Sequence, residues 1–453
     1  MDTTITATHI AYVRIQWVDL VNNIKCRVFP LSYFLKLLES SRPGVGVSKA
    51  SMGLVYLMVA PGFSRQGEYL YVPDLSTIRL CPYSSGEVVV FGWFNEKTPY
   101  LGIDNKLTLD VPLCSRATLQ RVVKESSKAG VEYLVGFESE FILLRSTKPV
   151  VAASNHSWSA TNGFSSGTVV AKTLKEIADG IQSSGIELQM YHAEGAPGQY
   201  EFVTGPLPPL EAADALIHTR EIIYNTAAKY GLRATFAPRI YMDSVGSSTH
   251  THISVHSEDN KKVPDELSSI ESSFLASVLA NLPALTALTL PTQASYKRVA
   301  DGVWSGGTYV NWGTENREAP VRLTNATSPS SRNFEMRFVD GTANPYVALA
   351  GILGVGFAGI RDKSELKIKD CSGPKTAAQL TENERQALGI TQRMSLTWEE
   401  ARQNLHKNTI LRDFVLGSEY MERYLAVNQT LADALDLDGN DEVAALTRLV
   451  EFY

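Results

Sequence analysis

The chain has 453 residues, of which 20% are charged and 44% are hydrophobic, and its formal net charge is −6. This composition is ordinary for a globular enzyme, and the length allows more than one domain. No block of basic residues occurs, so we expect no nucleic-acid partner. The four cysteines are scattered without a C-x-x-C pair. That pattern argues against a thiolate zinc site or a disulfide framework and favours a cytoplasmic protein.

The sequence contains no predicted leader or membrane span. Its first six residues, Met-Asp-Thr-Thr-Ile-Thr, lack the basic start and apolar run of a signal peptide. The longest uncharged apolar run that we identify, 347–360, is too short to cross a membrane and contains four glycines. With Asn344 as a cap and Pro345 in the first turn, this run predicts a buried helix.

Residues 1–107 are predicted to form a small strand-rich domain. Apolar and polar residues alternate over 13–17 and again over 24–28, on either side of an Asn22-Asn23 pair. This is the pattern of a β-hairpin. A short helix near 31–39 and strands near 54–59, 69–72 and 87–94 are expected to follow.

Residues 108–453 are predicted to form a larger α/β catalytic domain, which makes the protein α+β as a whole. Ser115 is expected to cap a helix that runs to about Lys128 and stops at Gly130. Predicted helices and strands then follow one another along the chain. Further helices are expected near 172–184, 209–230, 264–290, over most of 343–362 and over most of 396–450, and strands near 131–144, 187–194, 199–204, 233–241 and 250–256.

Four strand-like apolar stretches are interrupted by acids and histidines. Carboxylates are rarely buried unless they are paired or bound to a metal. Four such interruptions in one chain therefore indicate one shared ionic site. The stretches are Phe-Glu-Ser-Glu-Phe at 137–141, His-Ala-Glu-Gly-Ala-Pro-Gly-Gln-Tyr-Glu-Phe at 192–202, His-Thr-His at 250–252 and Phe-Glu-Met-Arg-Phe at 334–338.

Their spacing indicates a metal centre. Glu138 and Glu140 are two residues apart on a predicted strand, so they share one face, and the same holds for His250 and His252. Carboxylates with one imidazole suit Mg²⁺ or Mn²⁺. Each segment alone has an ordinary alternative, namely a solvated strand face, a structural histidine pair or half of a salt bridge. The recurrence of all four outweighs those alternatives.

Taken together and in order, the four segments resemble the glutamine synthetase superfamily, and most closely the type-I-like domain of FluG-type proteins and the γ-glutamyl-amine ligases. The resemblance implies an N-terminal β-grasp-like domain over 1–107 and a glutamine-synthetase-type catalytic domain over 108–453. It also implies a homo-oligomer of stacked rings, with ten to twelve subunits and active sites between neighbours. Further segments that match are 71–78, 295–298, 315–317 and 344–346.

The resemblance implies two or more Mg²⁺ or Mn²⁺ ions beside ATP. The ion that faces the acid substrate would be held by Glu140, Glu194 and Glu201, and the ion that faces the ATP phosphates by Glu138, His250 and Glu335.

Substrate contacts are also implied. Arg298, beside Gly246, would grip the α-carboxylate of a small acid, and Arg337 would face the reacting carboxyl group. Arg317 or Arg337 would support the oxyanion that forms when an amine attacks an acyl phosphate. The nucleotide would be contacted by His252 and Ser254, and its phosphates by Arg317, Arg322 and Arg332.

Two expected acids are missing. A glutamine synthetase holds and deprotonates ammonium with an aspartate on an N-domain loop and a glutamate on a flap. Here 43–52 contains no acid, and none occurs between Glu39 and Glu68. The flap position is occupied by Trp304, which suits the wall of a pocket for an organic amine. The alternative is that Asp301 replaces the flap glutamate.

The missing acids bear on the amine. An alkyl amine resembles lysine, with a pKa of about 10.4, and needs a base before it can attack. An aromatic or otherwise weakly basic amine does not, so the sequence favours one. Val245 stands where the family has an asparagine that helps to bind the α-carboxylate, but Arg298 remains, so glutamate is the expected acid. The alternatives are an ordinary glutamine synthetase, a non-catalytic relative and a guanidino kinase of related fold.

Overall fold

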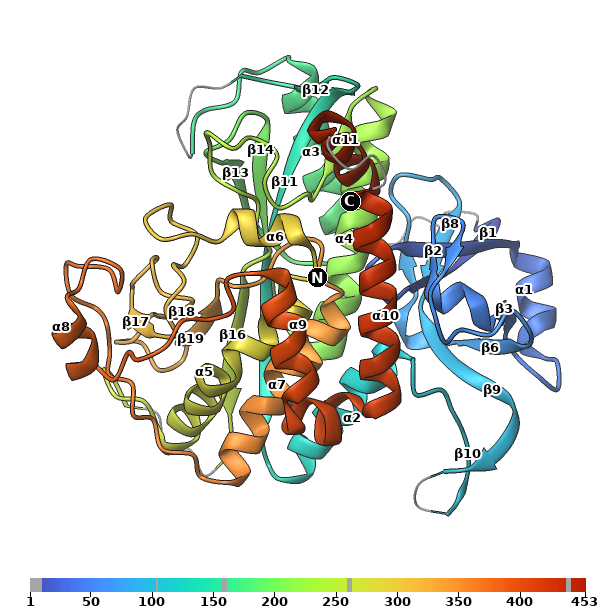
Figure 1. Ribbon diagram of the computed structural model, residues 1–453. Helices are drawn as coiled ribbons and strands as arrows, with labels where there is room; N and C mark the ends of the chain where they lie inside the picture. Colours follow the sequence, from blue (N-terminus) through green and yellow to red (C-terminus); the bar gives the residue numbers. More distant parts are fainter. Residues whose placement is uncertain (1–9, 103–104, 156–160, 259–262, 437–440) are drawn as a thin grey trace.

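The structure is a computed structural model that describes residues 10–102, 105–155, 161–258, 263–436 and 441–453. The predictions made for the first six residues, and for 437–440 within the last helical region, lie outside these residues. Figure 1 shows a small β-rich unit beside a larger unit of helices and strands. This is the α+β arrangement that the sequence predicts.

The first strands of the small unit form the predicted hairpin. β1 (Tyr12–Val18) and β2 (Ile24–Pro30) are antiparallel, and Asn22 adopts a φ of 66° in their turn. Asparagine tolerates this left-handed conformation better than most residues. β1 also pairs with β8 (Glu87–Val90), so the sheet order is β2-β1-β8-β7. Helix α1 (Leu31–Leu38) and strand β7 (Arg79–Leu80) complete this layer.

A second sheet completes the small unit, in the order β10-β9-β6-β3. The boundary expected after residue 107 falls inside β10, which pairs with β9 and extends the β9–β10 arm at the lower right of Figure 1. The strands are β3 (Val45–Ser48), β6 (Glu68–Pro73), β9 (Gly92–Leu101) and β10 (Leu107–Asp110), with a short ladder of β4 (Leu54–Val55) and β5 (Met58–Val59) beside them.

The larger unit is built on a nine-stranded sheet whose main path is β13-β14-β11-β16-β19-β18-β17. The long strand β11 lies inside this path and also pairs with β12 and β15. The strands are β11 (Glu132–Thr147), β12 (Val150–Ala152), β13 (Leu188–Ala193), β14 (Gln199–Leu207), β15 (Arg233–Thr235), β16 (Thr251–His256), β17 (Trp312–Thr314), β18 (Val321–Thr324) and β19 (Asn333–Met336).

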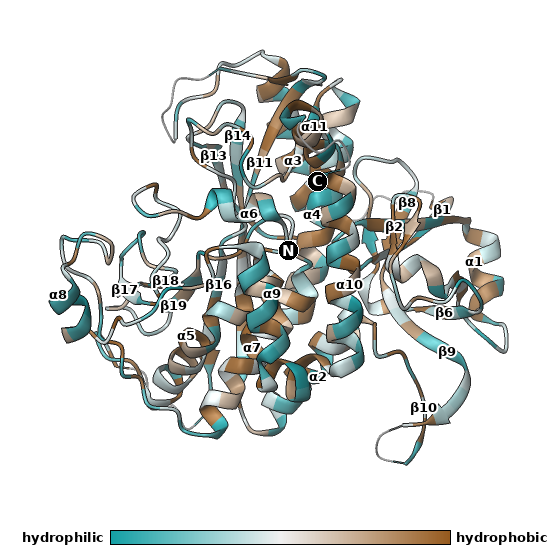
Figure 2. Ribbon diagram, in the orientation of Figure 1, coloured by the Kyte–Doolittle hydropathy of each residue, from teal (hydrophilic) through white to brown (hydrophobic). Residues whose placement is uncertain are grey.

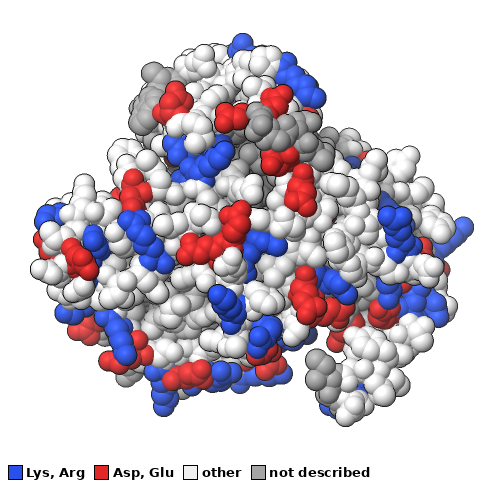
Figure 3. Space-filling view, viewed as in Figure 1, with Lys and Arg blue, Asp and Glu red and all other residues white. Residues whose placement is uncertain are grey.

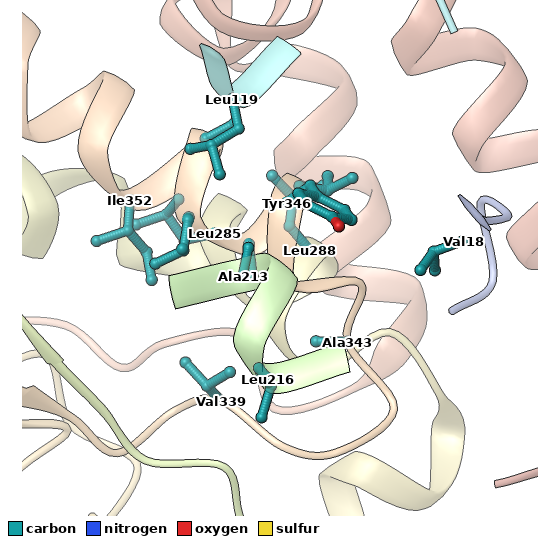
Figure 4. Packing of buried hydrophobic residues seen from close by; sticks show 14 of the residues in the cluster. Val18, Leu119, Ala213, Leu216, Leu285, Leu288, Val339, Ala343, Tyr346 and Ile352 are labelled. Atoms are coloured by element: carbon teal, nitrogen blue, oxygen red, sulfur yellow. The ribbon is translucent and has the colours of Figure 1, made fainter. Parts of the chain in front are cut away.

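Buried helices pack against this sheet and one another. The Asn344 side chain accepts hydrogen bonds from the backbone of Tyr346 and Val347, which confirms the predicted cap of α7. Figure 4 shows side chains of four helices meeting in the core, and Figure 2 shows hydrophobic residues along α7 and α5 and hydrophilic ones on α8. The four core helices are α2 (Ser115–Lys128), α4 (Pro209–Lys229), α5 (Ser269–Thr289) and α7 (Pro345–Arg361).

In the described part of the chain, one helix has the length and apolar composition of a membrane span. It is α5, and 72% of its most apolar window is buried inside the protein. It contacts α7 and α9. The remaining helical segments are α3 (Val169–Ser183), α6 (Gln293–Arg298), α8 (Glu382–Ala387), α9 (Trp398–Lys407), the π-helical turn Ile410–Leu416, α10 (Ser418–Leu435) and α11 (Glu442–Phe452).

Two local predictions were wrong. Ser115 is the first residue of α2 rather than its cap; Cys114 holds the cap position, and the Ser115 hydroxyl shares a 2.8 Å hydrogen bond with the Tyr420 hydroxyl. The strand expected over 233–241 ends at Thr235. Pro238 cannot donate to a strand ladder, and its carbonyl instead accepts from the backbone of Ser247.

Buried polar contacts fix the two units against each other. The Arg116 guanidinium donates to Asp214 of α4 at 2.8 Å and to Asp74 of the small unit at 3.0 Å. It also lies over the Trp93 ring, 3.9 Å from the centroid. His218 of α4 contacts the Leu80 carbonyl at 3.0 Å. Because Arg116, Asp214 and His218 are buried, breaking these contacts would leave unpaired polar atoms, which favours this arrangement of the two units.

Candidate active site

The central strand carries the two predicted acids on one face. Glu138 and Glu140 alternate along β11 with Phe137, which lies among apolar residues of α4 and α7. The acids therefore point away from the helices. Glu140 stands opposite Glu201 of β14 in the antiparallel register, and Glu201 stands opposite His192 of β13. Three neighbouring strands thus present ionisable groups on the same face.

The strands on the other side of β11 extend this face. The backbone N–H of Glu138 donates to the carbonyl of His250 at 3.0 Å, just before β16 begins. His252, two residues on, stands opposite Glu335 of β19. The predicted strand positions of His252 and Glu335 therefore converge on the acids of β11, although 83 residues separate them in sequence.

One group of potential metal ligands consists of the three residues that were predicted to share one ion. Glu138, His250 and Glu335 each offer one atom within 4.8 Å of the others. His250 Nδ1 lies 3.0 Å from a Glu138 oxygen and 3.5 Å from a Glu335 oxygen. Glu335 is only 1% exposed.

The second predicted group is assembled through histidines. Glu140 and Glu201 form a group with His250, and Glu194 joins Glu201 through His192. His192 lies 3.1 Å from Glu201 and 3.4 Å from Glu194. No role was predicted for His192, although its two-residue spacing from Glu194 repeats the spacing of the other pairs.

Glu140 is held in place by neighbouring polar groups that the sequence did not indicate. Ser248 donates to it from its hydroxyl at 2.6 Å and from its backbone at 2.9 Å. The Gln199 amide donates at 3.1 Å. These contacts fix the orientation of the carboxylate before any ion binds.

Burial and like charges raise the pKa of two acids. Burial raises the pKa of Glu201 to about 8, and the charges of Glu138 and Glu140 act in the same direction. Burial also raises the pKa of Glu194 to about 7, with a further contribution from Glu140. A hydrogen bond with Glu201 raises the pKa of His192 to about 9. This side of the site has more carboxylates than cations to neutralise them.

The other side is neutralised by the protein itself. Burial opposes the charge of Glu138, but hydrogen bonds from His250 and His252 hold its pKa well below the usual range. The pKa of Glu335 is also lowered against the effect of burial, chiefly by Arg337. Oxygen donors with single imidazoles are the ligands that Mg²⁺ and Mn²⁺ prefer, and a divalent cation would relieve the repulsion among these acids. The residues present therefore fit such ions.

Two predicted arginines converge on Glu335. Arg322 donates to it at 3.0 Å and also contacts Glu315. Arg337 pairs with Glu335 and donates to the Trp304 carbonyl at 2.9 Å. Arg317 is exposed on the loop after β17. Arg322 and Arg337 thus place positive charge at the edge of the carboxylate cluster.

The predicted acid-binding pair is tightly packed. Arg298 is 2% exposed, and its guanidinium donates to the Arg337 carbonyl at 3.0 Å. A Cβ on Gly246 would lie 2.3 Å from the Arg298 side chain, so only glycine fits there. Val245 packs beside Gly195, in the turn that follows Glu194. Val245, which stands where the family has an asparagine, therefore lies next to the candidate metal ligand Glu194.

The two nucleotide contacts predicted on β16 lie along the face of the cluster. His252 contacts Glu138 at 3.0 Å through Nε2 and Asn333 at 2.8 Å through Nδ1. Ser254 lies two residues further on, and its hydroxyl is 2.7 Å from His256. Both residues share the face of His250.

Arg332 requires a correction, because the structure does not bring it into the cluster. It is 1% exposed and donates to Glu271 of α5 at 2.7 and 3.2 Å and to the Val263 carbonyl at 2.7 Å. All of these contacts face α5 and its preceding loop. Its charge is therefore engaged in a structural ion pair rather than directed to a phosphate.

The two positions of the missing acids lie in different parts of the chain. Trp304 is 69% exposed, on a loop that follows α6. Asp301, the alternative acid, accepts hydrogen bonds from the Thr308 backbone at 2.8 Å and from Arg393 at 2.9 Å. Asp301 is thus engaged within the loop. The acid-free segment 43–52 forms β3 and a short helical turn in the small unit.

Comparison with known proteins identifies the family. A model of the glutamine synthetase catalytic domain matches residues 112–439, and the chain belongs to the glutamine synthetase family. Protein fluG of Emericella nidulans is 36% identical over 98% of this chain, which spans 49% of that relative's length. A γ-glutamylpolyamine synthetase of Streptomyces coelicolor is 30% identical over 74% of this chain and 73% of its own.

The fold agrees with solved structures. One described as a glutamine synthase homologue matches with a TM-score of 0.76 and 25% identity, over 98% of this chain and 99% of that one. The family and fold class predicted from the sequence are confirmed. The predicted enzyme class agrees with the names of the relatives, which include synthetases and a ligase.

Proposed function

We propose that the protein is an ATP-dependent ligase that joins glutamate, through its side-chain carboxyl group, to an organic amine rather than to ammonia. The observation that carries the proposal is the convergence of six candidate ligands on one sheet face, with Arg322 and Arg337 at its edge. Acidic and basic residues are interspersed on the face in Figure 3, so neither sign of charge dominates this face.

The reaction begins with activation of the acid. A carboxylate is a poor electrophile because its leaving group would be oxide. Transfer of the γ-phosphoryl group of ATP to the carboxylate releases ADP and creates a good leaving group. The amine nitrogen then bonds to the carbonyl carbon, phosphate leaves and the nitrogen loses a proton. Two Mg²⁺ or Mn²⁺ ions, when bound, supply charge neutralisation for the phosphoryl groups.

The residues of the chain orient the reactants in this proposal. Arg298 binds the α-carboxylate, with Gly246 leaving room for its side chain. Arg337 faces the reacting carboxyl group and stabilises the oxyanion. Arg317 and Arg322 contact phosphate, and His252 and Ser254 contact the nucleotide. The two ions are held by Glu140, Glu194 and Glu201, and by Glu138, His250 and Glu335.

The side chain of Trp304 favours an organic amine as the second substrate. Its indole is flat and apolar, and its loop residues 302–307 contain no acid that would hold ammonium. An aromatic or otherwise weakly basic amine arrives neutral and needs no strong base. The relative named γ-glutamylpolyamine synthetase also supports an organic amine over ammonia.

An assay of ADP release with glutamate and a panel of amines, with mass analysis of the products, tests the proposal. We expect a γ-glutamyl amide of an organic amine. Glutamine formed preferentially from ammonia would identify an ordinary synthetase. A phosphorylated guanidine would identify a kinase, and the absence of turnover with every amine would favour a non-catalytic relative.

We also propose a homo-oligomer of stacked rings, with about ten to twelve subunits. The exposed Trp304 loop and the segment 43–52 would then meet across neighbouring subunits. Light scattering coupled to gel filtration measures the assembly directly. Activity that falls on dilution together with the assembly supports shared sites, and a fully active monomer contradicts them.

A further inference from the structure

The Trp304 loop is clamped by a carboxylate from a separate segment. Glu318 lies just after Arg317, fourteen residues beyond Trp304 in the chain. One of its oxygens accepts a 2.6 Å hydrogen bond from the backbone N–H of Trp304. The other accepts a 3.2 Å hydrogen bond from the backbone N–H of Gly302. A carboxylate accepts from N–H groups more strongly than a neutral acceptor does, so both bonds favour one loop conformation.

The loop also packs closely on the segment that carries Glu318. Ser305 closes the base of the loop by exchanging two hydrogen bonds with the backbone of Ala300, at 3.0 and 2.9 Å. A Cβ on Gly307 would lie 2.8 Å from the Glu318 carbonyl. Gly307 has a φ of 62°, a left-handed conformation that glycine adopts readily. The loop therefore lies close to Glu318 at Gly302, Trp304 and Gly307.

Trp304 is held at both of its backbone polar groups. Its φ is 55°, which is uncommon for a residue with a large side chain. Its N–H is held by Glu318, and its carbonyl accepts from Arg337, whose other nitrogen pairs with Glu335. A continuous chain of contacts therefore runs from Glu318 through the Trp304 backbone to a candidate metal ligand. Such an uncommon conformation persists only where surrounding contacts impose it.

We propose that Glu318 is a positioning residue for the amine site. It holds the backbone of the Trp304 loop so that the indole forms one wall of the pocket in which the amine approaches the acyl phosphate. This inference rests on the proposed ligase function. It assigns to Glu318 a role in amine selectivity: the pocket takes a primary amine whose body is apolar or aromatic and packs on the indole. Both oxygens of Glu318 serve the loop, so Glu318 acts through Trp304 rather than on the amine itself.

Hydrogen–deuterium exchange tests the clamp without requiring activity. In Glu318→Ala, we expect faster exchange of the amides in 302–304, and an unchanged core strand β11. The exposed Glu365→Gln serves as the matched control and should leave the loop unchanged. Unaltered exchange in Glu318→Ala would overturn the clamp.

Kinetics separates positioning from other roles. Without amine, the α-nitrogen of glutamyl phosphate attacks its own acyl carbon; phosphate leaves, a proton is lost and 5-oxoproline forms. We expect Glu318→Ala to keep this amine-independent ADP release while raising the KM for the preferred amine about 10- to 100-fold, as for the loss of a charged hydrogen bond. Glu318→Gln keeps one acceptor, so its KM for the preferred amine should lie between those of the wild type and Glu318→Ala. Trp304→Ala should lose the same amine selectivity as Glu318→Ala.

Other outcomes overturn the proposal. Equal loss of the amine-independent and amine-dependent reactions would mean a general structural role. A lower kcat with an unchanged KM and a shifted pH profile would make Glu318 a proton acceptor instead. A wild-type protein that forms no ADP with glutamate refutes the ligase function, and the exchange experiment still decides whether the clamp exists.

Discussion

Glu140 and Glu201 stand directly opposite each other on β11 and β14, at 7% and 6% exposure. Two ionised carboxylates in this arrangement repel each other, and burial adds to the cost. Burial raises the pKa of Glu201, and the charges of Glu138 and Glu140 add to this effect. A protein retains such an arrangement when a cation completes it, and this pairing is therefore the basis of the metal predictions.

Mg²⁺ should bind more tightly at pH 8 than at pH 6. The pKa of Glu201 is raised to about 8, so at pH 6 the folded protein holds a proton that an ion must displace. Without metal, the contribution of Glu201 to the free energy of unfolding should fall as the pH rises from about 4.5 to 8, because the unfolded state loses this proton first. We expect at least about tenfold tighter binding at pH 8.

Thermal denaturation with increasing Mg²⁺ at both pH values measures this effect. Glu201→Gln should make the fall in stability with rising pH smaller, although the raised pKa values of Glu194 and His192 leave part of it, and should weaken the stabilisation by Mg²⁺. Equal Mg²⁺ affinity at the two pH values would contradict the assignment.

Glu140→Ala and Glu335→Ala should each abolish ATP turnover, with a decrease of at least about 100-fold. Their structural effects should differ. Glu140→Ala relieves a repulsion, whereas Glu335→Ala leaves the buried ends of Arg322 and Arg337 without their shared partner. Steady-state assays on folded variants, checked by circular dichroism, measure both. Near-normal turnover in either variant would refute the ligand assignment.

His218 should make the protein sensitive to acid. It is fully buried in α4, and burial lowers its pKa to about 4. Between pH 6.5 and 4 the unfolded state takes up a proton at His218 that the folded state does not, so the contribution of His218 to stability falls as the pH falls through this range. The shift corresponds to about 3 kcal/mol.

Urea unfolding at pH 7 and pH 5 of the wild type and His218→Gln tests this prediction. The glutamine can still donate to the Leu80 carbonyl, and the variant should lose less stability on acidification. Parallel losses in the two proteins would exclude His218 as the source.

Arg332→Ala should destabilise the protein without a specific effect on nucleotide binding. It removes one partner of a buried ion pair and leaves Glu271 uncompensated, which costs about 3–5 kcal/mol. In the protein that remains folded, the KM for ATP should match the wild type. A large increase in that KM with unchanged stability would restore a phosphate-binding role.

Sequence periodicity predicted much of the site because two-residue spacing decides which face of a strand carries a side chain. Glu138 with Glu140, and His250 with His252, share one face for this reason alone. The pairing of Glu140 with Glu201 depends on strand register between segments 61 residues apart, which no local pattern specifies. His192 lies two residues from Glu194, which is the same spacing as in the other pairs.

The remaining discrepancies arise from tertiary contacts. Arg332 resembled a phosphate ligand in sequence, but a buried acid of α5, 61 residues away, determines its position. Glu318 contacts the Trp304 loop only in the folded chain. The loop therefore has a carboxylate beside it that its own residues 302–307 do not supply. Serine is a residue type that commonly caps helices, but the Ser115 hydroxyl is buried and shares its hydrogen bond with the Tyr420 hydroxyl.

Competition between ammonia and organic amines, at equal concentrations with ATP, Mg²⁺ and glutamate, tests the central claim most directly. Mass spectrometry of the products reports which amide forms. The proposed ligase predicts a γ-glutamyl amide of an aromatic or other organic amine, with little glutamine. Glutamine as the dominant product would contradict it.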